Sequence, residues 1–103
     1  MDAAEFEEHV RVALDLLPAD IAAKLENLAV VVEDENAAEP DLFGLFSEDP
    51  YLPARVTIYR RPLVEDFGDD AELLREEIQI TVLHEVAHYF GIDEDRLAEL
   101  GYD

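Results

Sequence analysis

The stretch from residue 71 to residue 91 constrains the fold more than any other part of this chain. Apolar residues recur at every fourth position along it. They are Leu74, Ile78, Val82, Val86 and Phe90. This spacing predicts a long, largely buried helix that begins at residue 70 or 71 and turns an apolar ridge towards a core. Asp69 with Glu72 is typical of a capping box at its start, and Gly91 is typical of the left-handed residue that ends a helix.

Two histidines, His84 and His88, lie four residues apart on this helix. Their rings are expected on the same side, one turn above the other, where their nitrogens can share one small cation. Polar groups inside a buried helix need partners, because burying them unpaired is costly. The chain has three histidines, and since two of them lie here we interpret this pair as metal ligands. His9, the third, is interpreted as a surface residue.

Glu85 directly follows the first histidine, in the position of the general base of H-E-x-x-H hydrolases. A turn at Gly91 lets a later acid approach the same ion, and Glu94, six residues after His88, is the predicted third ligand. Two imidazoles, one carboxylate and an open coordination place are the arrangement of catalytic zinc. The chain has no cysteine, so nitrogen and oxygen atoms must hold the metal.

The nine residues from His84 to Ile92, His-Glu-Val-Ala-His-Tyr-Phe-Gly-Ile, are followed by three acids. This segment resembles the small bacterial zincin-like metallopeptidases, whose signature is H-E-x-x-H-x-x-G-x-x-D. The similarity extends upstream to Gly44-Leu45-Phe46 and to Val56–Arg60. The last signature position is Glu94 here rather than aspartate, which leaves its neighbours Asp93 and Asp95 as alternative third ligands.

The resemblance implies a minimal zincin-like fold with one zinc ion per chain and a peptide or protein substrate. It also implies that Val56–Arg60 is an edge strand beside the metal helix, with which an extended peptide would pair. The only methionine is Met1, so the methionine turn of true metzincins is absent. Tyr59, Tyr89, Arg96 and Tyr102 are the candidates for stabilising an oxyanion, and the sequence does not choose among them.

The remaining chain predicts a small α+β domain that spans residues 1–103. A helical pattern covers Ala3–Leu17, and a further short helical turn is expected at Ile21–Leu25. The predicted strands are Leu28–Glu33, Leu42–Phe46 and Arg55–Arg60, and a short helix is expected from residue 94 or 95 to Leu100. We therefore expect a small mixed or antiparallel sheet of about three strands. It should pack against the N-terminal helix and the long helix that carries the histidines.

The strands and the loops between them add further expectations. The continuously apolar strand Leu28–Glu33 should be covered on both faces. The alternating strand Arg55–Arg60 should have one wet face and is a candidate edge strand, where flanking arginines also protect against aggregation. Gly44 suggests a bulge or the close approach of another backbone. The acidic run that begins at Glu33 is read as a solvated loop, and Ser47–Pro53 as a second loop.

Composition limits the partners of this chain. Asp and Glu total 27 against 7 Lys and Arg, giving a formal net charge of -20. Such a surface repels phosphate backbones and anionic membranes, so we expect neither nucleic acid nor a membrane as a partner. The first eight residues are acidic where a secretory signal is basic, so a cytoplasmic location is expected. Nothing in the sequence indicates an oligomeric state.

Three functions are compatible with these observations. A metal-dependent peptidase that uses Glu85 as general base is favoured. The alternative is a catalytically weak or inactive zincin scaffold that acts as a metal-stabilised binding or regulatory module, since short chains gain stability from a metal. A metal-dependent ribonuclease, a class that also carries paired histidines on a helix, is disfavoured by the negative charge and by the acids at Glu85 and Glu94.

Overall fold

The computed structural model describes residues 1–103 except 18, 24, 92–94, 96–98 and 100–103. Its helices and strands follow one another along the chain. They are α1 (Ala3–Asp15), α2 (Ala19–Ala22), a 3-10 helix (Leu25–Asn27), β1 (Leu28–Glu33), β2 (Gly44–Asp49), β3 (Leu52–Tyr59), α3 (Arg60–Phe67) and α4 (Ala71–Phe90). The strands form a mixed sheet in the order β1-β3-β2, with β1 parallel and β2 antiparallel to β3. The predicted α+β class and the three-stranded sheet are therefore confirmed.

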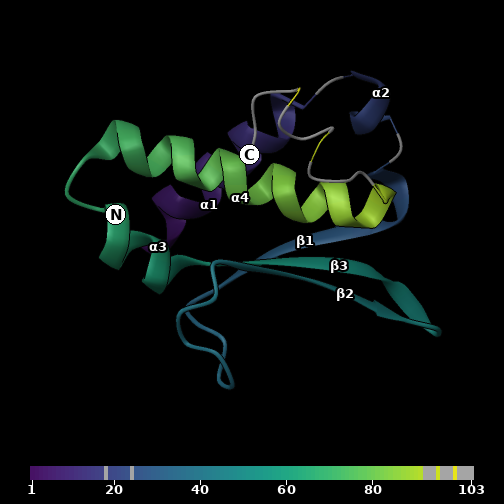
Figure 1. The fold of residues 1–103 in the computed structure, drawn as a ribbon, viewed down its shortest axis with the longest axis horizontal. Helices are drawn as coiled ribbons and strands as arrows, with labels where there is room; N and C mark the ends of the chain where they lie inside the picture. The colour runs from purple at the N-terminus through teal and green to yellow at the C-terminus, as the bar shows by residue number, and fades with distance from the viewer. Residues whose placement is uncertain (18, 24, 92–94, 96–98, 100–103) are drawn as a thin grey trace.

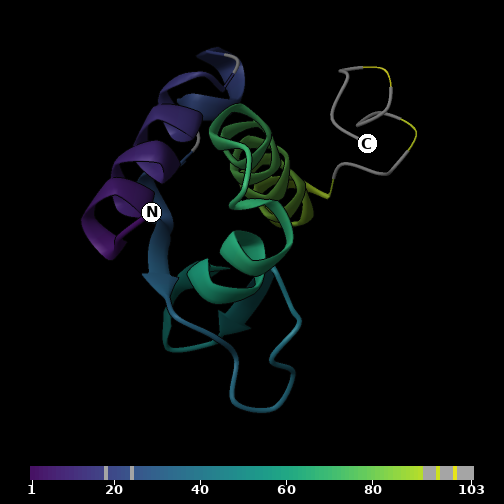
Figure 2. The ribbon, with the colours of Figure 1, turned by 90° about the vertical axis from the view of Figure 1, so that its left-hand side faces the viewer.

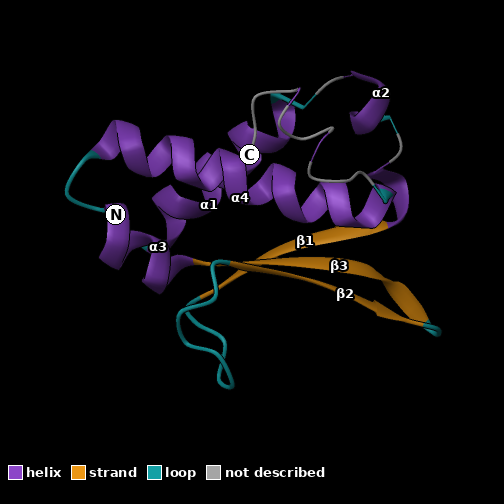
Figure 3. Cartoon of the chain, viewed as in Figure 1, coloured by secondary structure: helices purple, strands orange, loops and turns teal. Residues whose placement is uncertain are grey.

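The long helix α4 lies over the sheet, and α1 runs beside it in the same helical layer (Figures 1, 2 and 3). The apolar ridge of α4 forms the centre of the core, since Ile78, Val82 and Val86 are fully buried. Phe6 of α1 and Ile58 of β3 meet this ridge from either side and are also fully buried. Each such side chain contributes about 1.5–3 kcal/mol when it is removed from water. The core thus fixes α4 against the sheet and sets where its polar side chains lie.

Residues at the two ends of α4 explain where the helix begins and where it stops. Asp70 caps the start, because its Oδ1 accepts hydrogen bonds from the backbone N–H groups of Glu72 (3.0 Å) and Leu73 (3.2 Å). The cap is thus one residue later than Asp69, which the sequence suggested. Gly91 ends the helix with a left-handed backbone of φ 67° and ψ 24°, as expected.

The second strand differs from its prediction. It covers Gly44–Asp49 instead of Leu42–Phe46, and the expected loop Ser47–Pro53 is reduced to a tight turn between Asp49 and Leu52, which pair with each other. The Oδ1 of Asp49 accepts a hydrogen bond from the Tyr51 backbone N–H at 2.8 Å, which stabilises this turn. The bulge lies between Ser47 and Asp49 and not at Gly44.

The prediction that Arg55–Arg60 is an edge strand is wrong, because β3 is the central strand and Thr57 is buried. Arginines in β3 and at the start of the following helix α3 (Arg60–Phe67) pair with the acidic run that ends β1. Arg60 contacts Asp34 at 3.0 Å and Arg61 contacts Glu35 at 3.1 Å, while Arg55 lies 3.6 Å from Glu33. The run is therefore more than a solvated loop. As an outer strand of the described sheet, β1 is only half-buried, which corrects the expectation that both its faces are covered.

Helix α3, Arg60–Phe67, was not predicted, since Pro62 was interpreted as the end of a strand. Proline is tolerated in the first turn of a helix, and Leu63 anchors α3 by being fully buried. The short helical turn expected at Ile21–Leu25 is replaced by α2 and the 3-10 helix. The helix expected up to Leu100 lies largely outside the described residues. No helix within the described part of the chain combines the length and the apolar character that crossing a membrane requires.

Candidate metal and catalytic site

The two histidines of the motif lie together near the C-terminal end of α4. Their ring centroids are 5.1 Å apart and the ring planes are inclined at 63°. His84 is half-buried and His88 is exposed, so they stand at the margin of the core rather than inside it. This corrects the expectation of buried histidines. Side chains at i and i+4 share one side of a helix, and at these two positions solvent reaches that side.

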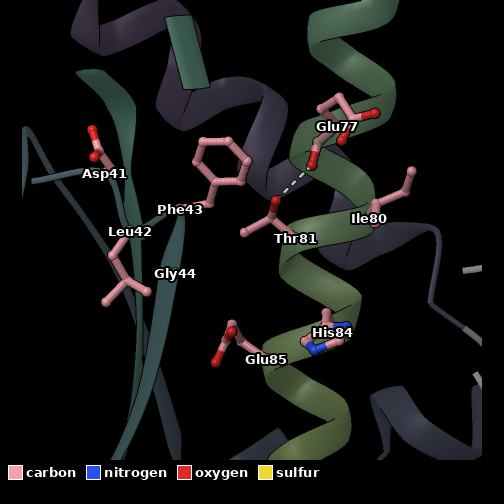
Figure 4. A pocket seen from close by; sticks show the side chains of 9 residues that line it. All are labelled: Asp41, Leu42, Phe43, Gly44, Glu77, Ile80, Thr81, His84 and Glu85. Carbon is pink, nitrogen blue, oxygen red and sulfur yellow. Dashed lines mark hydrogen bonds between the residues drawn. The ribbon is translucent and has the colours of Figure 1, made fainter. Parts of the chain in front are cut away.

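Glu85 is half-buried and extends from α4 towards β2, whereas His84 lies on the neighbouring side of the helix (Figure 4). Burial raises the pKa of the Glu85 carboxyl above its ordinary value. The positive charges that His88 and His84 can carry, and a hydrogen bond from the backbone N–H of Phe46, lower this pKa again without cancelling the rise. The carboxyl is thus held between the imidazole pair and the strand β2.

The outer edge of β2 faces this carboxyl. The backbone N–H of Tyr59 in β3 donates to the carbonyl of Phe43 at 2.8 Å. In an antiparallel pair, backbone groups alternate between facing the partner strand and facing away. Gly44 and Phe46 therefore turn their N–H and C=O groups away from β3, towards the outer edge, which agrees with the contact from the Phe46 N–H to Glu85. The ring of Phe46 also packs against Tyr89 of α4, with centroids 6.0 Å apart.

A pocket of about 360 Å³ adjoins Glu85. One wall is the segment 41–44 that enters β2, and the other is the side of α4 that carries Glu77, Thr81 and Glu85 (Figure 4). Spacings of four predict that these three helical residues share a side, but nothing in the sequence places Asp41 opposite them. Sequence reasoning had assigned Asp41 only to a solvated acidic loop.

The predicted third ligand, Glu94, lies outside the described residues, as does its alternative Asp93. Within the described part of the chain, no three acidic or histidine side chains gather closely enough to hold a metal ion. The donors that the structure does bring together are the two imidazoles of His84 and His88, which suit zinc well. These two imidazoles fit two of the ligand positions of a zinc ion.

Two of the four candidates for stabilising an oxyanion lie in the described chain. Tyr59 is buried, with 3% of its surface exposed, and its hydroxyl accepts a hydrogen bond from the Asn36 side chain at 2.9 Å. It is therefore unsuited to the role. Tyr89 is half-buried and lies one residue beyond His88, so it remains a candidate. Arg96 and Tyr102 lie outside the described residues.

The chain matches a known protein family. The sequence model of the zincin-like metallopeptidase family matches residues 25–102. This chain belongs to that family. No curated protein matches it. In this zincin-like protein the match includes the whole sheet, α3 and α4, while α1 precedes it. The resemblance found in the sequence is thereby confirmed at the level of the family.

Gly44 offers a direct test of how closely β2 approaches α4. A Cβ at this position would lie 2.8 Å from Cγ of Glu85 and 3.0 Å from Cγ2 of Thr81. Replacing Gly44 by alanine is expected to lower the free energy of unfolding by about 1–3 kcal/mol, because the packed side chains must shift. Urea denaturation measures this change.

The neighbouring residue supplies the control. Leu45 points to the other face of the strand and is 39% exposed, so Leu45→Ala should have a clearly smaller effect than Gly44→Ala. Wild-type stability in Gly44→Ala would show that β2 and α4 are farther apart than described.

Proposed function

We propose that this protein is a zinc-dependent peptidase. His84 and His88, with Glu94 beyond the helix end, would hold one zinc ion, and Glu85 would act as general base. The observation that carries this proposal is the position of the Glu85 carboxyl, which lies between the imidazole pair and the outer edge of β2. Zinc, when bound, supplies Lewis-acid activation of water and of the scissile carbonyl.

The sheet offers a binding position for an extended peptide substrate. An extended peptide can add to the outer edge of β2, where β3 does not use the N–H and C=O groups of Gly44 or the C=O group of Phe46, and the Phe46 N–H is bonded to Glu85. This replaces the edge strand Val56–Arg60 that the resemblance implied, because that segment lies in the centre of the sheet. A peptide bound there would run alongside Glu85, so its backbone would pass close to the proposed base.

Glu85 carries the proton transfers in this mechanism. Its carboxylate takes a proton from the attacking water and delivers it to the leaving amine. The pKa raised by burial suits this role, because a carboxyl that holds its proton more firmly is the stronger base. The hydrogen bond from the Phe46 N–H keeps the carboxylate turned towards the edge strand.

A metal-stabilised binding or regulatory module is the second candidate. It is favoured by the small size of the chain, 103 residues, and by the wide exposure of His88, which leaves little wall around the metal. Glu85 argues against it, because a structural zinc site is closed by its ligands and needs no base beside them. The net charge of -20 continues to disfavour a ribonuclease.

Hydrolysis of a mixed peptide library by zinc-loaded and chelated protein separates these functions. A peptidase cleaves the library only when zinc is present. Zinc binding without any cleavage would reject the peptidase and leave the binding module.

The third ligand can be tested by single substitutions. Glu94→Ala is expected to weaken zinc binding by more than about tenfold, because it removes a direct ligand. Asp93→Ala and Asp95→Ala remove equal charge from adjacent positions and should each change the affinity only slightly. Competition with a chromophoric chelator measures all three. Equal losses in the three variants would refute the assignment of Glu94.

A further inference from the structure

The pocket beside Glu85 has a distribution of charge that the proposed mechanism does not explain. Its floor and walls are largely apolar and include Leu42, Phe43 and Ile80. Two carboxylates flank it, Asp41 on the segment before β2 and Glu77 on α4 (Figure 4). Asp41 is exposed and Glu77 is half-buried, so each carboxylate is accessible from the pocket.

Neither of these carboxylates is neutralised within the described part of the chain. The salt bridges found there use Arg11, Arg55, Arg60 and Arg61, and each arginine contacts a different acid outside the pocket. The Glu77 backbone carbonyl accepts a hydrogen bond from the Thr81 hydroxyl at 2.8 Å, and no hydrogen bond of the Glu77 carboxylate is found among the same described residues. The pocket thus combines apolar walls with two carboxylates available to a cation.

The length of the pocket limits which group fits. Glu77 and Glu85 both line the pocket and are eight residues apart on α4, which corresponds to roughly 12 Å along the helix axis. No single side chain spans this distance, so a substrate residue has to enter the pocket partway along α4, and only a long side chain then brings a charge near Glu77. Lysine and arginine have this form, since their hydrocarbon stems lie along apolar surface while the charged head stays at the polar end.

We propose that this pocket binds a lysine or arginine side chain of the peptide substrate, with its stem on Phe43 and Ile80 and its cation between Asp41 and Glu77. The proposal rests on the proposed peptidase function, which it makes more specific. An acidic side chain is excluded by repulsion from the same carboxylates. An apolar side chain would gain from the walls but would leave both carboxylates without a partner, so it should bind more weakly.

Binding to the zinc-loaded Glu85→Gln variant of this chain tests the pocket separately from catalysis. The probes are short alanine peptides that carry a single lysine, moved through every position, and matched peptides with norleucine in its place. Norleucine keeps a hydrocarbon stem without the charge. At one position the lysine peptide is expected to bind about tenfold more tightly, the effect of two partly solvated ion pairs.

Substitutions in the same background identify the carboxylates responsible. Asp41→Asn combined with Glu77→Gln should reduce the preference for lysine to less than about threefold. Asp66→Asn combined with Glu76→Gln is the matched control, because both residues are exposed acids outside the pocket and the change in net charge is the same. This control should keep the full preference.

The outcomes separate the two proposals. Equal affinity for lysine and norleucine at every position would overturn the assignment, as would equal losses in the two double variants. Hydrolysis of the same peptides by the wild-type protein is measured in parallel. A preference for lysine without hydrolysis would reject the peptidase and support the pocket. Hydrolysis without that preference would reject the pocket alone.

Discussion

Glu85→Gln is expected to abolish hydrolysis while zinc binding is retained. Removing a general base lowers the turnover number by about 10²- to 10⁴-fold. The amide of glutamine has nearly the shape of the carboxyl but cannot take up the proton from water. The fold should not suffer, because burial of the Glu85 carboxyl disfavours its charged form, and the neutral amide avoids that cost. Turnover on a cleaved library peptide, zinc content and urea denaturation measure the three properties.

A matched variant separates loss of the base from loss of charge. Glu76→Gln removes one exposed acid from the same helix and should leave turnover unchanged. If Glu85→Gln retained wild-type turnover, Glu85 could not be the base. If it lost its zinc, the carboxyl would have to be assigned to the metal rather than to the proton transfer.

His84→Ala is expected to lose both zinc and hydrolysis. Replacing a group that merely supports a ligand costs 10- to 100-fold in metal affinity, so removing the ligand should cost more than about 100-fold. His88→Ala should behave in the same way, because its ring lies 5.1 Å from that of His84 and would share the ion. Chelator competition gives the affinities, and turnover is measured with added zinc.

The third histidine provides the control for this pair. His9 lies on α1, far along the sequence from the motif, and His9→Ala should keep wild-type zinc affinity. Tight zinc binding by His84→Ala would show that the metal is held elsewhere. Equal losses in all three histidine variants would indicate an effect on folding rather than on a site.

The long helix was predictable because its signals are local. The spacing of Ile78, Val82 and Val86 defines the buried side of α4, and Gly91 ends the helix with the backbone that glycine favours. The position of Glu85 next to His84 follows from that helix alone. These features depend on residues a few positions apart, where the periodicity and capping preferences of helices are decisive.

The order of the strands was not predictable in the same way, since it depends on residues far apart in the sequence. Arg60 and Asp34 are 26 residues apart, and their contact helps place β3 beside β1. An arginine-flanked strand alone is equally typical of an edge. The pocket could not be predicted for the same reason, because Asp41 and Glu77 line it from segments that only the tertiary fold brings together.

The solvent exposure of the histidines could likewise not be predicted from the sequence pattern. The apolar ridge of α4 predicted a largely buried helix with its histidines inside, yet His88 is exposed. The layer of α1 and the sheet cover the ridge and leave the adjacent side of the helix uncovered in the described structure. In the proposed mechanism this uncovered side would let a metal and a substrate approach Glu85, which a fully buried helix would prevent.

X-ray absorption at the zinc edge of the purified protein tests the central claim most directly. A zinc ion held by His84 and His88 should show two imidazole nitrogens at about 2.0–2.1 Å. That signal should disappear in His84→Ala. A zinc environment made only of oxygen atoms, or a spectrum unchanged by the substitution, would contradict the site described for α4.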